Sequence, residues 1–192
     1  MPGFGDPAAR IVLVGLAPGA HGSNRTGRMF TGDASGDFLY PALHRAGLAS
    51  RPDSVARDDD LALRGVWITA AARCVPPGNA PTTAELDACR PWLAFDLDAL
   101  VHARVVVALG RVAHDAVLKH LRSRGLRLTL AAHPFAHGAL HALDALPGAG
   151  EAGALPLLDS FHVSFQNTNT GRLTAAMFDA LLERAVQLAG AP

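Results

Sequence analysis

Four short apolar runs, separated by longer segments with helical spacing, constrain the fold of this chain more than any other feature. The runs cover residues 11–15, 66–69, 105–109 and 157–161, and each is rich in aliphatic residues and bounded by turn-forming ones. Runs of this kind are typical of buried parallel strands. Because strands that alternate with helices join through right-handed crossovers, the pattern predicts an α/β domain. A length of 192 residues fits one domain over 1–192.

The segments between the runs carry the start and stop signals of helices. Thr82 and Glu85 have the spacing of a capping box, and an apolar stripe follows them, with Pro91 expected to kink the helix. Further helices are expected from about Arg111 to Arg124, from Thr174 onward and, shorter, after Ser35. The stretch 131–156 is rich in Ala, Gly, Pro and His without a sustained period, which predicts a surface excursion before the fourth run.

Composition and charge exclude several classes of protein. Hydrophobic residues make up 49% of the chain and charged residues 18%, which excludes a disordered segment, and no apolar run is long enough to span a bilayer. The 17 basic residues balance the 17 acidic ones, so bulk charge does not indicate a nucleic-acid partner and any basic surface must be local. The first residues lack the pattern of a secretory signal, so we expect a cytoplasmic protein without a membrane partner.

Polar and glycine-rich segments follow the carboxyl ends of the four runs. Ligands of an open parallel sheet bind outside these ends, so the segments are expected to converge on one site. The first segment lacks the Gly-Lys-Ser/Thr of a phosphate-binding loop and breaks the dinucleotide G-x-G-x-x-G pattern. Its glycines fit tight turns as well as a ligand loop, with Asp33 or Ser35 capping the next helix. They are Gly15, Gly19, Gly22, Gly27, Gly32 and Gly36.

Two side chains and one polar run in these segments have both a structural and a functional interpretation. Phe30 lies in a polar loop, where it either plugs into the core or presents a flat face to a planar ligand. His162 directly follows the fourth run, where it either points into the crevice or bonds locally to the backbone. The run 166–172 is either an ordinary polar loop or a set of donors for phosphates and base edges.

Three motifs in these loops carry a resemblance to a known family. They are GLAPG with HGSNRTGRMFTGDASG after the first run, Cys-Val-Pro-Pro-Gly-Asn after the second, and HVSFQNTNTG after the fourth. Together they closely resemble the family 5 uracil-DNA glycosylases, and the likeness extends from Pro2 to about Ala189. The resemblance implies the uracil-DNA glycosylase fold, an α/β three-layer sandwich with a four-stranded parallel sheet flanked by helices.

The implied function is that of a monofunctional DNA glycosylase in base excision repair, which hydrolyses the N-glycosidic bond of uracil. A non-catalytic DNA-binding remnant of the same fold is the alternative. A third interpretation is a small-molecule α/β enzyme that uses the same crevice, although the sequence shows no cofactor fingerprint for one.

The resemblance also implies roles at a base pocket. A glycosylase flips the nucleotide out of the duplex and stabilises the charge that develops on the leaving base. Phe30 would stack on the base, and His162 would donate to its O2. Family 4 carries Glu where this chain has Leu16, so Asp33 is the candidate to orient the attacking water, with helix capping as its competing role. The backbone beside the base would come from Gly15, Leu16, Ala17, Pro18 and Gly19.

The segment after the second run predicts a permissive pocket. Where family 4 has a base-reading Asn, this sequence reads Thr69-Ala70-Ala71-Ala72, and we expect Ala71 to border the base. An Ala side chain cannot enforce a hydrogen-bond pattern, so discrimination between bases should be poor. Hydrolysis of other deaminated bases, hypoxanthine and xanthine among them, is therefore expected.

The expected partner is DNA that contains uracil or another deaminated base, bound by a monomer. Local Arg residues in the converging loops are the candidates for phosphate contacts. The resemblance adds Ser164 as a phosphate ligand, while Phe165 and Gln166 would wedge into the duplex beside Asn167. The Arg candidates are Arg25, Arg28 and Arg172.

Families 4 and 5 usually hold a 4Fe–4S cluster with four cysteines, and Cys74 and Cys89 match the second pair by context. Two thiolates cannot supply the four ligands that such a cluster takes. Spacing alone indicates core thiols. Three explanations stay open: a start codon placed too far downstream, which we favour, a deliberately shortened chain, or a natural member without the cluster.

Overall fold

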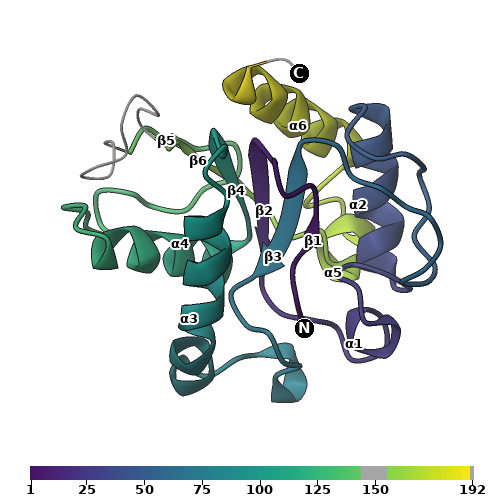
Figure 1. Ribbon diagram of the computed structural model, residues 1–192, viewed down its shortest axis with the longest axis horizontal. Coiled ribbons are helices and arrows are strands. Elements are labelled where there is room, and N and C mark those ends of the chain that lie inside the picture. The colour runs from purple at the N-terminus through teal and green to yellow at the C-terminus, as the bar shows by residue number, and fades with distance from the viewer. Residues whose placement is uncertain (144–154, 191–192) are drawn as a thin grey trace.

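A computed structural model describes residues 1–143 and 155–190, and Figure 1 shows helices on both faces of a central sheet. The sheet has six strands in the order β1-β3-β2-β4-β6-β5. Its four central strands are parallel and coincide with the four apolar runs to within one residue at their ends. They are β2 (Ile11–Gly15), β3 (Val66–Ala70), β4 (Val105–Leu109) and β6 (Leu157–Ser160). The predicted parallel sheet is confirmed.

Two short antiparallel strands extend the sheet beyond the predicted four. β1 (Phe4–Gly5) pairs with β3, and β5 (Leu140–His141) pairs with β6. Strands of two residues show no alternation in sequence, so the pattern that identified the central strands could not identify these. β5 lies inside the stretch expected to be a surface excursion, of which residues 144–154 lie outside the described part of the chain.

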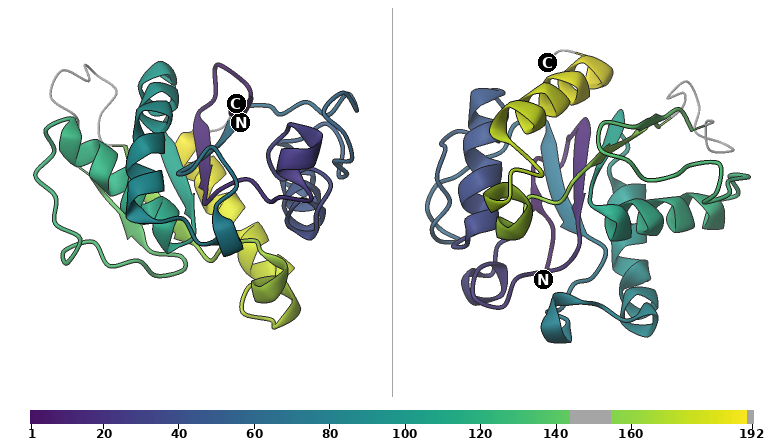
Figure 2. Two further views of the ribbon diagram at one scale, coloured as in Figure 1. Left: turned by 90° about the horizontal axis from the view of Figure 1, so that it is seen from below. Right: turned by 180° about the vertical axis from the view of Figure 1, so that it is seen from behind.

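The helices form the two outer layers of the sandwich. α2 (Ala34–Arg45) and α6 (Ala175–Ala189) pack on one face of the sheet, and α3 (Thr83–Ala99) and α4 (Arg111–Ser123) on the other (Figures 1 and 2). Alternate residues of β2 point into the two cores, because successive side chains of a strand face opposite sides. Ile11 and Leu13 join the α2–α6 core, while Val12 and Val14 join the α3–α4 core.

Side-chain caps fix the helix starts that the sequence predicted. Thr82 and Glu85 form the capping box of α3, and Thr174 accepts from the Met177 amide at the start of α6. α3 runs as one helical span through Pro91. In the described residues, no helix combines the length and the apolar character needed to cross a bilayer.

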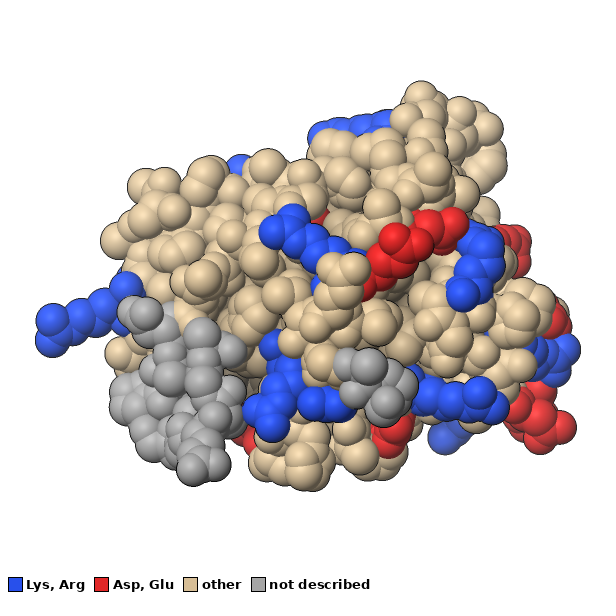
Figure 3. All heavy atoms as spheres, turned by 90° about the horizontal axis from the view of Figure 1, so that it is seen from above, with Lys and Arg blue, Asp and Glu red and all other residues tan. Residues whose placement is uncertain are grey.

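Short helical turns complete the loops at the carboxyl ends of the strands. α1 (Ser23–Thr26) follows β2, the 3-10 turn η1 (Pro77–Asn79) follows β3, and α5 (Phe165–Asn169) follows β6. Figure 3 looks at the opposite end of the molecule, where basic and acidic side chains lie next to one another. That end therefore shows no large surface of a single charge.

Candidate active site

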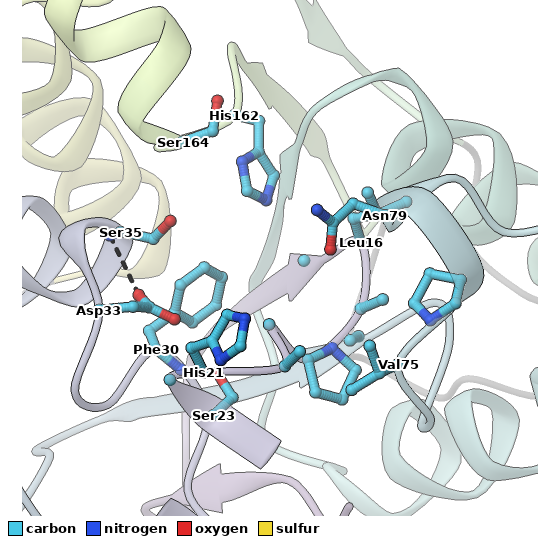
Figure 4. A pocket seen from close by; sticks show the side chains of 18 of the residues that line it. Leu16, His21, Ser23, Phe30, Asp33, Ser35, Val75, Asn79, His162 and Ser164 are labelled. Carbon is cyan, nitrogen blue, oxygen red and sulfur yellow. Dashed lines mark hydrogen bonds between the residues drawn. The ribbon is translucent and has the colours of Figure 1, made fainter. Parts of the chain in front are cut away.

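The loops after β2, β3 and β6 enclose one cavity of about 920 Å³ at the carboxyl edge of the sheet. The left view of Figure 2 looks at this edge, and Figure 4 shows the cavity from close by. Three of the four segments that were expected to converge therefore do so, while among the described residues the segment after β4 contributes none to the lining. Its lining includes Gly15, Leu16, Ala17, Pro18, Gly19, Phe30, Asp33, Asn79, His162, Ser164, Phe165 and Gln166.

Phe30 and His162 face each other inside this cavity, with ring centroids 6.2 Å apart and an interplanar angle of 39°. Phe30 has a φ of 52°, in the left-handed region that bulky residues rarely adopt. Its amide donates to the Ser23 hydroxyl at 2.9 Å, and the Tyr40 hydroxyl donates to the Met29 carbonyl at 2.7 Å. These bonds hold the strained turn, so the ring is placed before any ligand arrives.

Gly15 provides the space that the Phe30 ring occupies. A Cβ atom at Gly15 would lie 2.9 Å from Cζ and 3.3 Å from Cε2 of Phe30. Gly110, at the end of β4, does the same for His162, because a Cβ there would lie 3.3 Å from the histidine Cβ. Both rings therefore pack directly on the ends of central strands.

The buried Arg28 belongs to the fold beneath this loop, and the prediction that it contacts DNA is wrong. Both its terminal nitrogens lie 2.7 Å from the two carboxylate oxygens of Asp59, and its Nε donates to the Thr31 hydroxyl at 2.9 Å. Only 2% of its side chain is exposed. The hydrogen bonds from Arg28 hold the pKa of Asp59 far below its usual range. A guanidinium engaged in this way has no donors left for a phosphate.

His162 is an uncharged donor at neutral pH. Burial lowers the pKa of its imidazole below the usual value, and the carboxylate of Asp33 opposes this shift to a smaller extent. The Asn167 amide nitrogen donates to the His162 carbonyl at 2.8 Å, which fixes the backbone of the loop. The predicted site residue Asn167 thus contacts His162 and does not line the cavity.

Asp33 caps α2 and also lines the cavity. Its Oδ1 accepts from the amides of Ser35 and Gly36 at 3.0 and 3.1 Å, which caps α2. Its Oδ2 faces the loop of Gly19 and Gly22, where Cβ atoms would lie 3.1 and 1.9 Å from it. The carboxylate lies on the cavity wall beside Phe30 (Figure 4). One oxygen therefore serves the helix while the other is directed toward the cavity.

One further prediction changes after β3, and one cavity residue is added there. The cavity is lined by Ala70, whereas Ala71 borders a separate groove between α3 and α4, so the prediction that Ala71 contacts the base is wrong. Neighbouring residues of an extended chain point to opposite sides, which explains the shift by one position. Asn79 lines the cavity with a φ of 58° and was not singled out in the sequence. Its place in a Pro-Pro-Gly-Asn turn was the available signal.

The other residues that were predicted to contact DNA are exposed or line the cavity. Phe165 and Gln166, at the start of α5, line the cavity, and the Phe165 side chain is 63% exposed. Arg25 is exposed on α1 and donates to the His21 carbonyl at 2.7 Å. Arg172 is exposed and stacks over the Phe161 ring at 4.5 Å.

The cysteines do not fit the expected 4Fe–4S cluster. Cys74 is exposed, and the partly buried Cys89 accepts a hydrogen bond from the Arg73 amide at 3.3 Å. These are the only two cysteines of the chain, and such a cluster takes four thiolates. Neither residue lines the cavity, so no chemical step at this site is assigned to them.

Comparison with known proteins places this architecture in a family. Residues 2–186 match the uracil DNA glycosylase superfamily. A type-5 uracil-DNA glycosylase of Thermus thermophilus is 58% identical over 99% of this chain and 80% of its own length. Those of Mycobacterium leprae and Pyrobaculum aerophilum are each 46% identical, over 99% of this chain and 78% and 76% of their lengths. With its whole described fold inside these matches, the chain belongs to the type-5 uracil-DNA glycosylases.

Proposed function

We propose that the chain removes uracil from DNA by hydrolysing the N-glycosidic bond, as the first step of base excision repair. The observation that carries this proposal is the placement of Phe30, His162 and Asp33 around one cavity, with the two rings 6.2 Å apart. A base inside a duplex is out of reach, so the nucleotide must be flipped into such a cavity. The cavity is built from one chain, which supports action as a monomer.

The cavity residues divide the chemistry among them. Phe30 offers its ring to the face of the flipped base. The amides of Ala17 and Gly19 donate to no other protein group in the described part of the chain, so they are available to acceptor atoms on the edge of the base. His162 donates an N–H bond to the base oxygen on which negative charge grows as the bond breaks. This interaction is stronger in the transition state than in the ground state, which is the requirement for catalysis.

Asp33 acts on the attacking water in this proposal. Its Oδ2 is directed toward the cavity, while Oδ1 is held by two backbone amides, so the carboxylate has a fixed orientation. A fixed carboxylate orients a water toward the sugar carbon and accepts its proton. The carboxylate also stabilises the positive charge that develops on the sugar.

We extend the proposal to other deaminated bases such as hypoxanthine and xanthine. The strand end that borders the cavity offers the methyl group of Ala70, and the neighbouring loop offers backbone amides. A pocket rejects wrong ligands when they leave its buried polar side chains unpaired, and Ala70 brings no polar side chain to this strand end. The chain should therefore act on duplexes that contain hypoxanthine or xanthine in addition to duplexes that contain uracil. Cleavage of uracil alone would contradict the permissive pocket.

DNA contacts are assigned to the exposed rim. Arg25 and Arg172 are the proposed phosphate ligands, and Ser164 is placed to hold a phosphate next to the extruded nucleotide. The exposed Phe165 ring and Gln166 would fill the gap left in the base stack. The proposal involves no iron–sulfur cluster in the reaction.

The test compares two substitutions of Asp33 in a single-turnover assay. The chain is incubated with a uracil-containing duplex, alkali is added, and strand scission is measured. D33N keeps an oxygen for the cap, so its melting temperature should stay within about 2 °C of the wild type while the rate falls about 10²–10⁴-fold. D33A should show the same fall in rate. It should also lose about 1 kcal/mol of stability from the cap, which lowers its melting temperature by about 2–4 °C.

The outcomes separate the competing functions. Unchanged scission by D33N would restrict Asp33 to capping. Binding of the duplex by the wild-type chain without scission would identify a DNA-binding remnant. Neither binding nor scission would point to the small-molecule enzyme.

A further inference from the structure

A buried cluster of two histidines and one aspartate lies outside the base cavity. His114 comes from α4, His141 from β5 and Asp159 from β6, three elements that meet at one side of the sheet (Figure 1). His114 Nδ1 is 2.8 Å from one carboxylate oxygen of Asp159, and His141 Nε2 is 3.0 Å from the other. The three candidate ligand atoms all lie within 4.8 Å of one another. Nothing in the proposed glycosylase reaction uses this cluster.

The Asp159 carboxylate needs a positive partner. Its side chain is completely buried, and those of His114 and His141 are 1% and 9% exposed. Both ion pairs of Asp159 are with imidazoles, and within the described residues no Lys or Arg side chain contacts it. An ionised carboxylate without a counter-charge is costly in such a place. The counter-charge must come from a proton on an imidazole or from a bound cation.

The hydrogen bond on the far side of His114 orients it as a metal ligand is usually oriented. His114 Nε2 lies 2.9 Å from the His133 carbonyl, which can only accept, so Nε2 carries the proton. A neutral His114 then presents the lone pair of Nδ1 to the carboxylate of Asp159, an arrangement that is repulsive unless a second proton on the ring or a cation lies between them. The carboxylate also accepts from the Ala136 amide at 3.3 Å, which supplies no net charge. Histidines that bind metals commonly donate their other N–H to a backbone carbonyl in this manner.

We propose that His114 Nδ1, His141 Nε2 and the Asp159 carboxylate bind one divalent transition-metal ion, of which zinc is the best match. Imidazole and carboxylate ligands suit zinc, whereas magnesium and calcium prefer oxygen ligands. Zinc bonds of about 2.0–2.2 Å at tetrahedral angles separate ligand atoms by about 3.3 Å. The present separations, 2.8 Å from His114 Nδ1 to one carboxylate oxygen and 3.0 Å from His141 Nε2 to the other, would open by a few tenths of an ångström, and the three ligand atoms already lie within 4.8 Å of one another.

The ion would join α4 and the edge strand β5 to the strand that leads into the base cavity. Asp159 lies three positions before His162, and the intervening Phe161 donates its amide to His137 Nδ1 at 3.2 Å. The Phe161 ring also stacks on that of His137 at 4.9 Å. The segment with His137 and His141 is therefore the support on which the His162 loop rests.

The experiment measures zinc binding by the whole chain. Protein freed of metal with a chelator is titrated calorimetrically with zinc sulfate and melted with and without zinc. We expect one equivalent to bind, and at a free concentration 100 times the Kd the melting temperature should rise by about 5–10 °C. H141N should bind at least about 10-fold more weakly. H102N, at an exposed histidine outside the cluster, and the C74S/C89S double variant should bind as the wild type does.

Any of the following results would overturn the proposal. Equal zinc binding by H141N and the wild type would place the metal elsewhere. Loss of binding in C74S/C89S would assign it to the thiols. No binding tighter than about 10 μM by a folded wild-type chain would leave a proton as the only counter-charge of Asp159. Should H141N not fold, X-ray absorption of the zinc-loaded wild type decides: a nitrogen and oxygen shell supports the site, and a sulfur shell overturns it.

Discussion

Substitution of Gly15 by Ala tests whether the exact position of the Phe30 ring governs catalysis. The added Cβ would meet Phe30 Cζ at 2.9 Å, whereas ordinary contact begins at 3.4 Å and extends to 4 Å. The ring must therefore retreat by about 0.5–1 Å. A displacement of this size at a reacting geometry costs up to about 10²-fold in rate. We expect the single-turnover rate on a uracil duplex to fall about 10–100-fold in G15A.

The stability of G15A should change much less than its activity. Overpacking costs about 1–3 kcal/mol, and we expect the lower end because the cavity beside the ring gives it space to move. The melting temperature should therefore fall by about 2–4 °C. A folded protein with a large loss of rate is the combination that a purely structural role of Gly15 would not produce.

The F30L background provides the matched control for this prediction. A smaller side chain at Phe30 removes the atoms with which the new methyl group collides, so adding G15A to F30L should change the rate by less than about threefold. Residues in direct contact are expected to show such non-additivity in a double-mutant cycle. Full activity of G15A, or the same fold-loss in both backgrounds, would refute the reasoning.

Two further predictions concern Arg28, Arg172 and His162. R28A should lower the free energy of unfolding in urea by about 3–5 kcal/mol, because it leaves the Asp59 carboxylate buried and unpaired, and should not alter the slope of log DNA affinity against log salt. R172A should reduce that slope by about 0.9 and leave the stability unchanged. A reduced slope at unchanged stability in R28A would instead identify Arg28 as a DNA contact. Because burial lowers the pKa of His162, the unfolded chain takes up its proton first, and stability that is full above about pH 6.5 should be lost as the pH falls. Between pH 7.5 and 5.5 the free energy of unfolding in urea should fall more for the wild type than for H162Q, and an equal loss in both would contradict the assignment.

The sequence predicted the central strands and the helix starts because both depend on local pattern. The aliphatic runs of the four strands and the Thr82–Glu85 capping box are decided by residues close together in the chain. The edge strands β1 and β5 depend on pairing with distant strands, and two residues are too few to show a period. Local pattern therefore determines the frame of the sheet but not its borders.

The sequence predicted the location of the site more accurately than the contacts of its individual residues. Strand order brought Phe30, Asp33 and His162 to one cavity, as expected. Arg28 was misassigned because its ion-pair partner Asp59 lies 31 residues away, and no local sequence pattern around Arg28 predicts that ion pair. Ala71 was misassigned by a single position, because the orientation of a side chain after a strand depends on where the strand ends.

The double use of Asp33 limits how this protein can be stabilised. At most helix starts Ser, Thr, Asn and Asp are interchangeable at small cost, which makes these positions convenient targets for engineering. Here the side chain that begins α2 also borders the cavity. Under the proposed role of Asp33 in orienting the attacking water, replacement of its second oxygen by an amide or a hydroxyl would lower the rate. A substitution that stabilises the start of α2 and a substitution that lowers turnover would therefore fall on the same residue. A stabilised variant that keeps its activity should be sought by substitution at other helix ends.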